Sequence, residues 1–372
     1  KEINHSMASG ALRVLALACK KVGDGVDIKD IDQIESDLIF LGLIGIRDPP
    51  RSEAYEAIAT CHEAGIRVIM ITGDHEYTAK SVGIELEICD EESETISGYD
   101  LEDIDDFKLI EVVKDVNIFC RVTPDQKMRI VQALQKSKEV VAMTGDGVND
   151  APALSSANIG IAMGIAGTDV ARDAADMVLQ DDNFANIVHA IEEGRKIYWN
   201  IRNFVRYQVS TNVAAVLIII LSSFVFGWEN LPLTATQILV INILMDGPPA
   251  VALGMEKNHG SVMTRPPRPV SEGLPNLIDT VMIAFLGTLM AIGSLIVHYT
   301  VLGQSTVEEA ITATFAVFVM FQLFNVMNCR SIEKSIFELG VFSNRAVAYS
   351  FLISTTLLFV IIEFSHITVP LI

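Results

Sequence analysis

The fold of the first half of the chain is decided by the stretch EVVAMTGDGVND at residues 139–150. Its apolar start, with two valines, is typical of a short buried strand. Its end places two carboxylates and an amide, Asp146, Asn149 and Asp150, on a turn with two glycines. Such glycines let the backbone approach a ligand closely. Mg²⁺ prefers carboxylate oxygens and takes water and phosphate as its other ligands. The stretch therefore predicts a strand that ends in a metal or phosphate site.

Similar short β-branched runs lie on both sides of this stretch, with helical patterns between them. One helix begins at the capping sequence Thr123-Pro124-Asp125-Gln126. Alternation of strands and helices is the pattern of a parallel α/β sheet, whose ligands bind beyond the carboxyl ends of the strands. The predicted strands are residues 67–71, 116–122, 139–143 and 159–163.

Two further groups of polar residues fall at these strand ends. Thr72 and Gly73 could offer a hydroxyl and a backbone amide to a phosphoryl oxygen, and Lys127 could place a positive charge beside it. Taken alone, the first group is an ordinary turn and Lys127 is a solvated charge. Their order on successive strand ends favours phosphate handling. The sequence has no GxxxxGK[ST] motif, so this is not a P-loop.

Charge is distributed unevenly along the 372 residues. The chain has 27 Lys and Arg against 47 Asp and Glu, but residues 204–372 contain only seven and ten of them. The acidic balance disfavours nucleic acid as a partner, because phosphates would be repelled. The five cysteines form no CxxC pair, which disfavours a disulfide framework and a zinc ribbon.

Five apolar runs of spanning length follow one another in the second half. The loops at residues 255–277 and 330–345 contain Lys and Arg, whereas the turns on the other side contain none. The positive-inside rule then places residues 1–203 and both basic loops in the cytosol. Five buried helices of a large soluble protein are the alternative. The predicted spans are residues 204–227, 233–254, 278–302, 310–329 and 346–364.

The first span is predicted to begin before the bilayer. Residues 183–226 contain no proline and a single glycine, Gly194. A continuous helix here would make residues 183–203 a stalk between the cytosolic part and the membrane. Because five is an odd number of spans, we expect the chain to be part of a longer one.

The second span contains a carboxylate, Asp246, well inside an apolar run. Such a group is costly in a membrane and indicates function. Asn242 is four residues earlier, so an α-helix would place both on one face. Pro248-Pro249 lack amide hydrogens, which frees carbonyl groups one turn earlier. We expect an oxygen cage for a cation. A proline kink with a snorkelling acid is the alternative. Asp279 and Glu363 lie at span ends, from which they can reach the interface.

Several motifs resemble those of the P-type cation-transporting ATPases. The stretch at residues 143–179, MTGDGVNDAPALSSANIGIAMGIAGTDVARDAADMVL, is similar to the hinge region of that family. DPPR at 48–51, ITGDHEYTAKSVG at 71–83 and CRVTPDQKMRIVQAL at 120–134 match in the same order. The resemblance implies a haloacid-dehalogenase-like domain joined to a helical transmembrane bundle. It also implies a catalytic aspartate, in a DKTGT motif, that accepts the γ-phosphoryl group of ATP.

The resemblance assigns a role to each candidate residue. Asp146 would hold Mg²⁺, Asn149 and Thr72 would contact the phosphoryl group, and Lys127 would neutralise it. Asp150 would order that cluster, and Arg13 would contact ATP.

The resemblance also divides the chain. Residues 1–39 would end a nucleotide-binding domain, 40–182 would form the phosphorylation domain, 183–203 the stalk and 204–372 the transmembrane domain. The sequence contains neither DKTGT nor the TGES dephosphorylation motif. We therefore expect the nucleophile in an N-terminal part of the same pump that is missing here.

The transported ion implied by the resemblance is Ca²⁺. Asn242 and Asp246 match residues that hold Ca²⁺ in calcium pumps, and NILMDGPPA is most similar to secretory-pathway Ca²⁺/Mn²⁺ pumps and bacterial relatives. Ala215 and Gln322 stand where two-site pumps have glutamates, so one site is expected. All-oxygen ligands disfavour copper and zinc. The membrane would be a bacterial plasma membrane or one of the secretory pathway. A pump for Mn²⁺ or a monovalent ion, and a membrane-tethered phosphatase-like protein that does not pump, are the alternatives.

Overall fold

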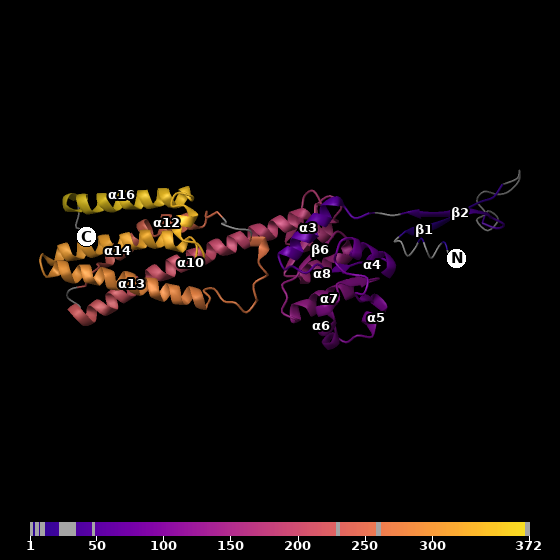
Figure 1. Ribbon diagram of the computed structural model, residues 1–372, viewed down its shortest axis with the longest axis horizontal. Helices are drawn as coiled ribbons and strands as arrows, with labels where there is room; N and C mark the ends of the chain where they lie inside the picture. Colours follow the sequence, from indigo (N-terminus) through magenta and orange to yellow (C-terminus); the bar gives the residue numbers. More distant parts are fainter. Residues whose placement is uncertain are drawn as a thin grey trace. The chain divides into compact units, whose positions relative to one another are not determined.

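The computed structural model describes residues 3, 7, 12–21, 35–46, 49–227, 231–257 and 262–368. Figure 1 shows the order of its elements along the chain. The chain divides into two compact units. The α/β unit contains residues 1–191 and 263–270, and the helical unit contains residues 192–262 and 271–372.

The α/β unit contains two parallel sheets of three strands each, in the orders β3-β5-β4 and β6-β7-β8. This confirms the predicted parallel α/β architecture. β3 and β6 are edge strands, and each leads directly into one of the predicted polar motifs. The strands are β3 (Met70–Ile71), β4 (Thr95–Ser97), β5 (Ile118–Cys120), β6 (Ala142–Gly145), β7 (Ile159–Met163) and β8 (Met177–Leu179).

The strand bounds differ from the prediction, and the predicted strand at residues 116–122 is reduced to β5, Ile118–Cys120. β6 begins at Ala142 and not at residue 139, because its pairing begins with Ala142 opposite Ile159. The first predicted strand is reduced to Met70 and Ile71. β4 and β8 were not predicted, because three residues are too few to show a period-2 pattern.

Helices connect these strands as the sequence predicts. α7 begins with the expected capping box, in which Thr123 and Gln126 each bond the backbone of the other. Its buried residues Ile130 and Leu134 pack against Phe119 of β5. The helices are α3 (Ser52–Glu63), α4 (Glu76–Glu85), α5 (Gly98–Glu102), α6 (Asp106–Asp115), α7 (Pro124–Lys136), the 3₁₀ turn η1 (Val148–Asp150), α8 (Ala151–Ser156) and α9 (Asp169–Ala174).

An antiparallel pair of strands precedes the parallel sheets. β1 (Arg13–Cys19) pairs with β2 (Ile39–Ile46), with an irregularity between Leu17 and Ala18. Much of β2 is exposed although its side chains are apolar.

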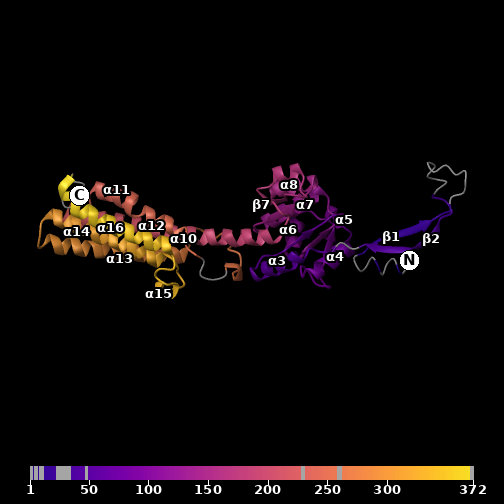
Figure 2. The same cartoon turned by 90° about the horizontal axis from the view of Figure 1, so that it is seen from above.

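The longest helix, α10 (Ala185–Phe226), runs without a break through the predicted stalk and the first span, which confirms the expected continuity. The remaining long helices of the helical unit lie beside one another in Figures 1 and 2. They are α13 (Leu277–Leu302), α14 (Val307–Cys329) and α16 (Arg345–Thr368), with the short η3 (Val262–Thr264) and α15 (Ile336–Leu339) in the loops.

Within the described residues, five helical segments are long and apolar enough to cross a membrane, in agreement with the five predicted spans. The second is not one regular helix. It consists of α11 (Ala235–Val240), a π-turn, η2 (Ile241–Met245), and α12 (Gly247–Leu253).

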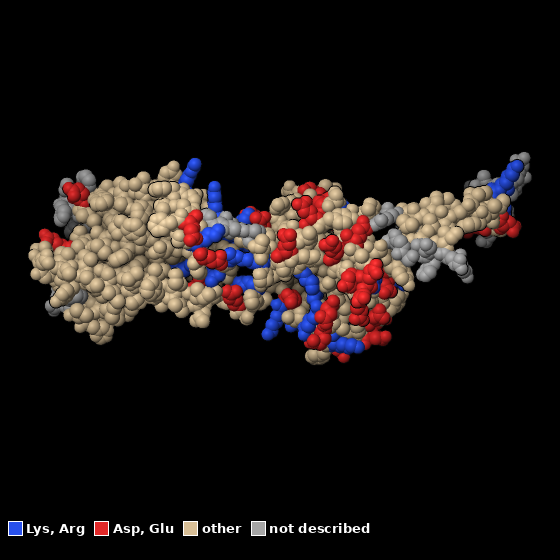
Figure 3. All heavy atoms as spheres, viewed as in Figure 1, with Lys and Arg blue, Asp and Glu red and all other residues tan. Residues whose placement is uncertain are grey.

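The helical unit packs tightly inside and is apolar outside. Phe315 and Phe318 of α14 are fully buried in a core that includes Ile218 of α10. At Gly287 of α13, an added Cβ would lie 2.8 Å from the Val213 side chain, so the two helices approach closely. Figure 3 shows few charged groups over the outer face of these helices. Such a surface is suited to lipid.

Candidate functional site

The turn that follows β3 is tied to the end of β5. The backbone amide of Val122 donates to the Thr72 carbonyl at 3.2 Å, and that of Arg121 donates to the Asp74 carbonyl at 3.1 Å. The Thr72 hydroxyl donates to Asp74 Oδ2 at 3.0 Å. Gly73 is exposed, and no atom lies within 4 Å of the position of a Cβ there. A ligand can therefore reach the backbone at Gly73.

The turn that follows β6 is folded around the Asp150 carboxylate. Asp150 Oδ2 accepts hydrogen bonds from the backbone amides of Asp146 and Gly147 at 3.3 and 3.1 Å. Asp150 Oδ1 lies 2.6 Å from Lys127 Nζ, and the two side chains are 9% and 16% exposed. The structure thus brings together two predicted residues from α7 and η1.

Burial of Asp150 opposes its ionisation, but the Lys127 ammonium and the two backbone amides outweigh that effect. The pKa of Asp150 is therefore lowered from its ordinary value. The contact holds Lys127 beside the loop that contains Asp146.

Asp146 and Asn149 are exposed on the same loop. Within the described residues, neither side chain makes a hydrogen bond, so both remain available for ligands. The Asp146 carbonyl accepts the Thr168 amide at 2.8 Å, which fixes the backbone at this point.

This donor set fits Mg²⁺. No group of three His, Cys, Asp or Glu side chains that could hold a metal lies in the described part of the chain. Mg²⁺ does not need one, because it binds to one or two carboxylates and completes its shell with water and phosphate. Asp146 could supply such a carboxylate. Arg13 opens β1, but its side chain lies outside the described residues.

In the helical unit, Asp246 lies at the joint between η2 and α12 and is only 1% exposed. Its Oδ1 accepts a hydrogen bond of 3.0 Å from the Tyr207 hydroxyl of α10. Its Oδ2 is buried and has no hydrogen-bond partner among the described residues. A buried carboxylate oxygen without a partner is costly unless a cation or a proton reaches it.

The two predicted ligands of this span differ in burial, because Asn242 is exposed whereas Asp246 is buried. The segment between them is not the regular α-helix that was predicted. It contains the π-turn, in which the Asp246 amide donates to the Ile241 carbonyl five residues back, at 2.9 Å. Asn242 as a ligand of the cation stays a prediction.

Other polar residues of the spans have structural partners. Asn325 Nδ2 of α14 donates to Ser210 Oγ of α10 at 2.7 Å, so this side chain joins two helices. Asp279 does not reach toward an interface as expected. It is 1% exposed and pairs with Arg202 at 2.7 Å. Gln322 is also buried, and its Oε1 finds no hydrogen-bond partner within the described ranges.

Sequence reasoning missed Tyr207. It lies on the buried face of the first span, 39 positions from Asp246, and no local motif joins the two. The available signal was a tyrosine inside an apolar helix, because a buried hydroxyl usually has a hydrogen-bond partner.

Comparisons with known proteins follow the same division of the chain. A family model described as cation transporting ATPase, C-terminus, matches residues 230–369. Models described as haloacid dehalogenase-like hydrolase match residues 3–158 and 127–191.

Similar curated proteins include calcium-transporting ATPase 1 of Yarrowia lipolytica, 44% identical over 94% of this chain and 37% of that protein. Calcium-transporting ATPase type 2C member 2 of Rattus norvegicus is 44% identical over 93% of this chain and 35% of its own length. A calcium-transporting ATPase of Bacillus subtilis is 42% identical over 96% of this chain and 40% of its own length. The chain thus spans well under half the length of these relatives.

Proposed function

This chain belongs to the cation-transporting ATPases, and from that premise we propose that it is part of an ATP-driven calcium pump. The α/β unit would handle phosphate and Mg²⁺, and the helical unit would bind Ca²⁺ in the membrane. The remaining part of the pump, including the aspartate that is phosphorylated, would lie outside the present chain. Its relatives are bacterial and secretory-pathway types, and the chain is a multi-pass membrane protein.

The observation that carries the proposal is the Asp246 carboxylate. It is buried in the middle of a candidate span, and one of its oxygens has no hydrogen-bond partner in the part of the chain that the structure describes. A cation that leaves water needs a formal negative charge to offset its desolvation. Pro248 and Pro249 follow after Gly247 and cannot donate to the carbonyls of Leu244 and Met245. Carboxylate and carbonyl oxygens are the ligands that Ca²⁺ prefers.

The α/β unit supports the phosphoryl-transfer half of the cycle. Lys127 is held at the loop after β6, where its charge can neutralise a phosphoryl oxygen. The Thr72 hydroxyl and the Gly73 amide would bind the same group, and Asn149 would contact it from the other loop. Mg²⁺ at Asp146 would supply positive charge to the transferring phosphoryl group. Arg13 would contact ATP.

The test is Ca²⁺ binding to the protein as its own gene encodes it, in lipid nanodiscs. Wild type, Asp246→Asn and the control Glu363→Gln, an exposed acid of α16, would be titrated with radioactive Ca²⁺, and with Mn²⁺ in a parallel series. Loss of the buried charge should cost about 3–5 kcal/mol, which is on the order of 10²- to 10⁴-fold in Kd. The control should bind as wild type does.

Wild-type affinity in Asp246→Asn would show that Asp246 is a structural residue. A wild-type protein that hydrolyses phosphate esters and binds neither cation would instead be the membrane-tethered phosphatase.

A further inference from the structure

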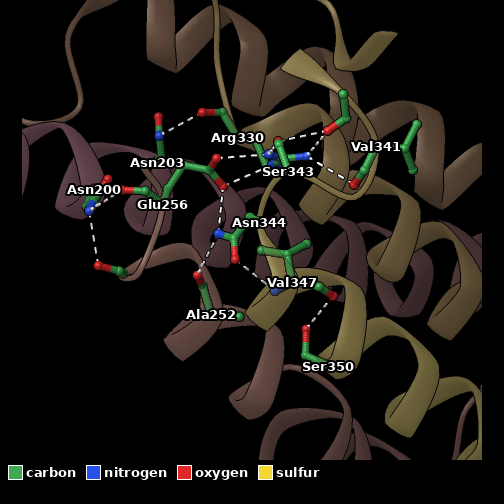
Figure 4. Close-up of polar contacts among 12 residues, drawn as sticks. Asn200, Asn203, Ala252, Glu256, Arg330, Val341, Ser343, Asn344, Val347 and Ser350 are labelled. Carbon is green, nitrogen blue, oxygen red and sulfur yellow. Dashed lines mark hydrogen bonds and ion pairs between the residues drawn. The ribbon is translucent and has the colours of Figure 1, made fainter. Parts of the chain in front are cut away.

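A buried ion pair lies beyond the other end of α12. Glu256 and Arg330, the C-cap residue of α14, form two parallel contacts of 2.9 Å, Nε to Oε2 and Nη2 to Oε1 (Figure 4). The two side chains are 3% and 0% exposed. Such a fork fixes distance and orientation together.

The pair is part of a larger hydrogen-bond network that includes the loop before α16. Arg330 Nη1 donates to the carbonyls of Gly340 and Val341 at 3.1 and 3.3 Å, and Nη2 donates to Ser343 Oγ. Together with the fork, these bonds use all five guanidinium hydrogens. The charge is thereby satisfied in one particular arrangement of the loop.

Asn344 connects the pair to α16 and back to α12. Its Nδ2 donates to Glu256 Oε2 at 2.8 Å and to the Ala252 carbonyl at 3.2 Å. Its Oδ1 accepts the Val347 amide at 3.1 Å, in the first turn of α16. Figure 4 shows these side chains pointing toward one another.

α10 holds the same point from another side. Asn200 donates to the carbonyls of Gly254 and Glu256 at 3.0 and 3.2 Å. Asn203 donates to the Arg330 carbonyl at 3.0 Å. The carboxyl end of α12 is thus tied to α10, α14 and α16.

The opposite end of α12 carries Asp246 as its N-cap residue. α12 has seven residues, about 10 Å of helix, and is preceded by the irregular η2. A segment this short moves as one piece, so anchoring its carboxyl end sets the position of Asp246. A buried ion pair adds little net stability compared with an apolar pair, but it does fix geometry.

We propose that Glu256 and Arg330 are positioning residues for the cation site, because they hold α12 so that Asp246 faces the ion. This inference rests on the proposed Ca²⁺ binding at Asp246. Neither residue touches the ion in this proposal. They act through α12, as outer-shell partners act on metal ligands.

The test uses the protein as its gene encodes it, in nanodiscs, with Ca²⁺ Kd and thermal unfolding measured on the same samples. The double variant Glu256→Met, Arg330→Met removes both charges and leaves none buried without a partner. Arg330→Lys keeps the charge and loses the fork. Glu338→Gln, an exposed acid of α15, is the matched control.

We expect the double variant to unfold within about 5 °C of wild type while its Kd for Ca²⁺ rises roughly tenfold or more. Arg330→Lys should also raise the Kd, and Glu338→Gln should change neither quantity. If the double variant does not fold, the Kd of Arg330→Lys for Ca²⁺ tests the inference in its place.

Two outcomes overturn the inference alone. In one, the variants bind Ca²⁺ with wild-type Kd. In the other, their affinity and their unfolding temperature fall together, so that the pair is only a part of the fold. A wild-type protein that binds no Ca²⁺ removes the proposed function and this inference with it.

Discussion

The two candidate sites each contain a buried carboxylate, but they differ in whether a positively charged side chain lies beside it. In the α/β unit, Asp150 is paired with Lys127 at 2.6 Å and bonded by two backbone amides. In the helical unit, Asp246 receives a hydrogen bond from neutral Tyr207 and makes no ion pair with any described residue.

This difference distinguishes a carboxylate that holds a loop in place from a carboxylate that can bind a cation. A carboxylate that already has its cation is complete, and its task is to hold the neighbouring loop in place. A buried carboxylate without one is unfavourable until a cation or a proton arrives. The α/β unit therefore presents its free acid, Asp146, at the surface, whereas the helical unit holds its free acid inside.

The largest effect is expected from a change of the exposed acid, Asp146. Asp146→Asn should lower ATP turnover on the order of 10³-fold, because Mg²⁺ at the phosphoryl group loses a charged ligand. Ca²⁺ binding in the membrane should be unchanged. Turnover and Ca²⁺ binding would be measured on the same preparation. Normal phosphorylation in this variant would contradict the assignment of Asp146.

Removal of the neutral hydrogen bond to Asp246 should have the next largest effect. Tyr207→Phe leaves the carboxylate without its donor and should lower the free energy of unfolding by about 1–3 kcal/mol without Ca²⁺. Saturating Ca²⁺ should recover part of that loss, because the ion satisfies the carboxylate. Thermal unfolding with and without Ca²⁺ checks this. The Tyr299→Phe variant, an exposed tyrosine of α13, is the control.

Loss of a hydrogen bond between two uncharged side chains in the same unit should lower stability by a smaller amount. Asn325→Ala breaks the contact with Ser210 and should cost about 0.6–2 kcal/mol of stability. Ca²⁺ Kd should change little, because Asn325 is assigned to helix packing. A large rise in Kd at unchanged stability would instead make Asn325 a ligand.

The smallest effect depends on pH. The pKa of Asp150 is lowered in the folded state, so its stabilising contribution is present above its unfolded pKa of about 3.9 and is lost as pH falls through the folded value. The free energy difference between wild type and Asp150→Asn should therefore be full at pH 6 and shrink below pH 4. Denaturant unfolding at several pH values measures it. A difference that stays constant down to pH 3 would show that Asp150 acts without its charge.

Local motifs were predicted well because their geometry is set by neighbouring residues. The capping box at Thr123 and the turn after β6 are read from a few consecutive positions. The contact between Lys127 and Asp150 is less local, because the strands that precede them, β5 and β6, belong to different sheets.

Contacts between spans could not be predicted in the same way. Glu256 and Arg330 are 74 positions apart, and Tyr207 and Asp246 are 39 apart, with no motif to join them. The π-turn at Ile241–Met245 interrupts the α-helical period from which Asn242 was predicted as a ligand. The buried pairing of Asp279 depends on Arg202 from a different helix.

The π-turn at Ile241–Met245 has a further consequence for the broken span. One surplus residue acts as a phase shift of about 100° between the segments on either side of it. The face that α11 shows to its neighbours is thereby decoupled from the direction in which Asp246 points. A deletion of one residue in this turn would restore the regular winding and rotate α11 by about 100° relative to Asp246. The direction in which the Asp246 carboxylate points thus depends on the number of residues in this turn as well as on their identity.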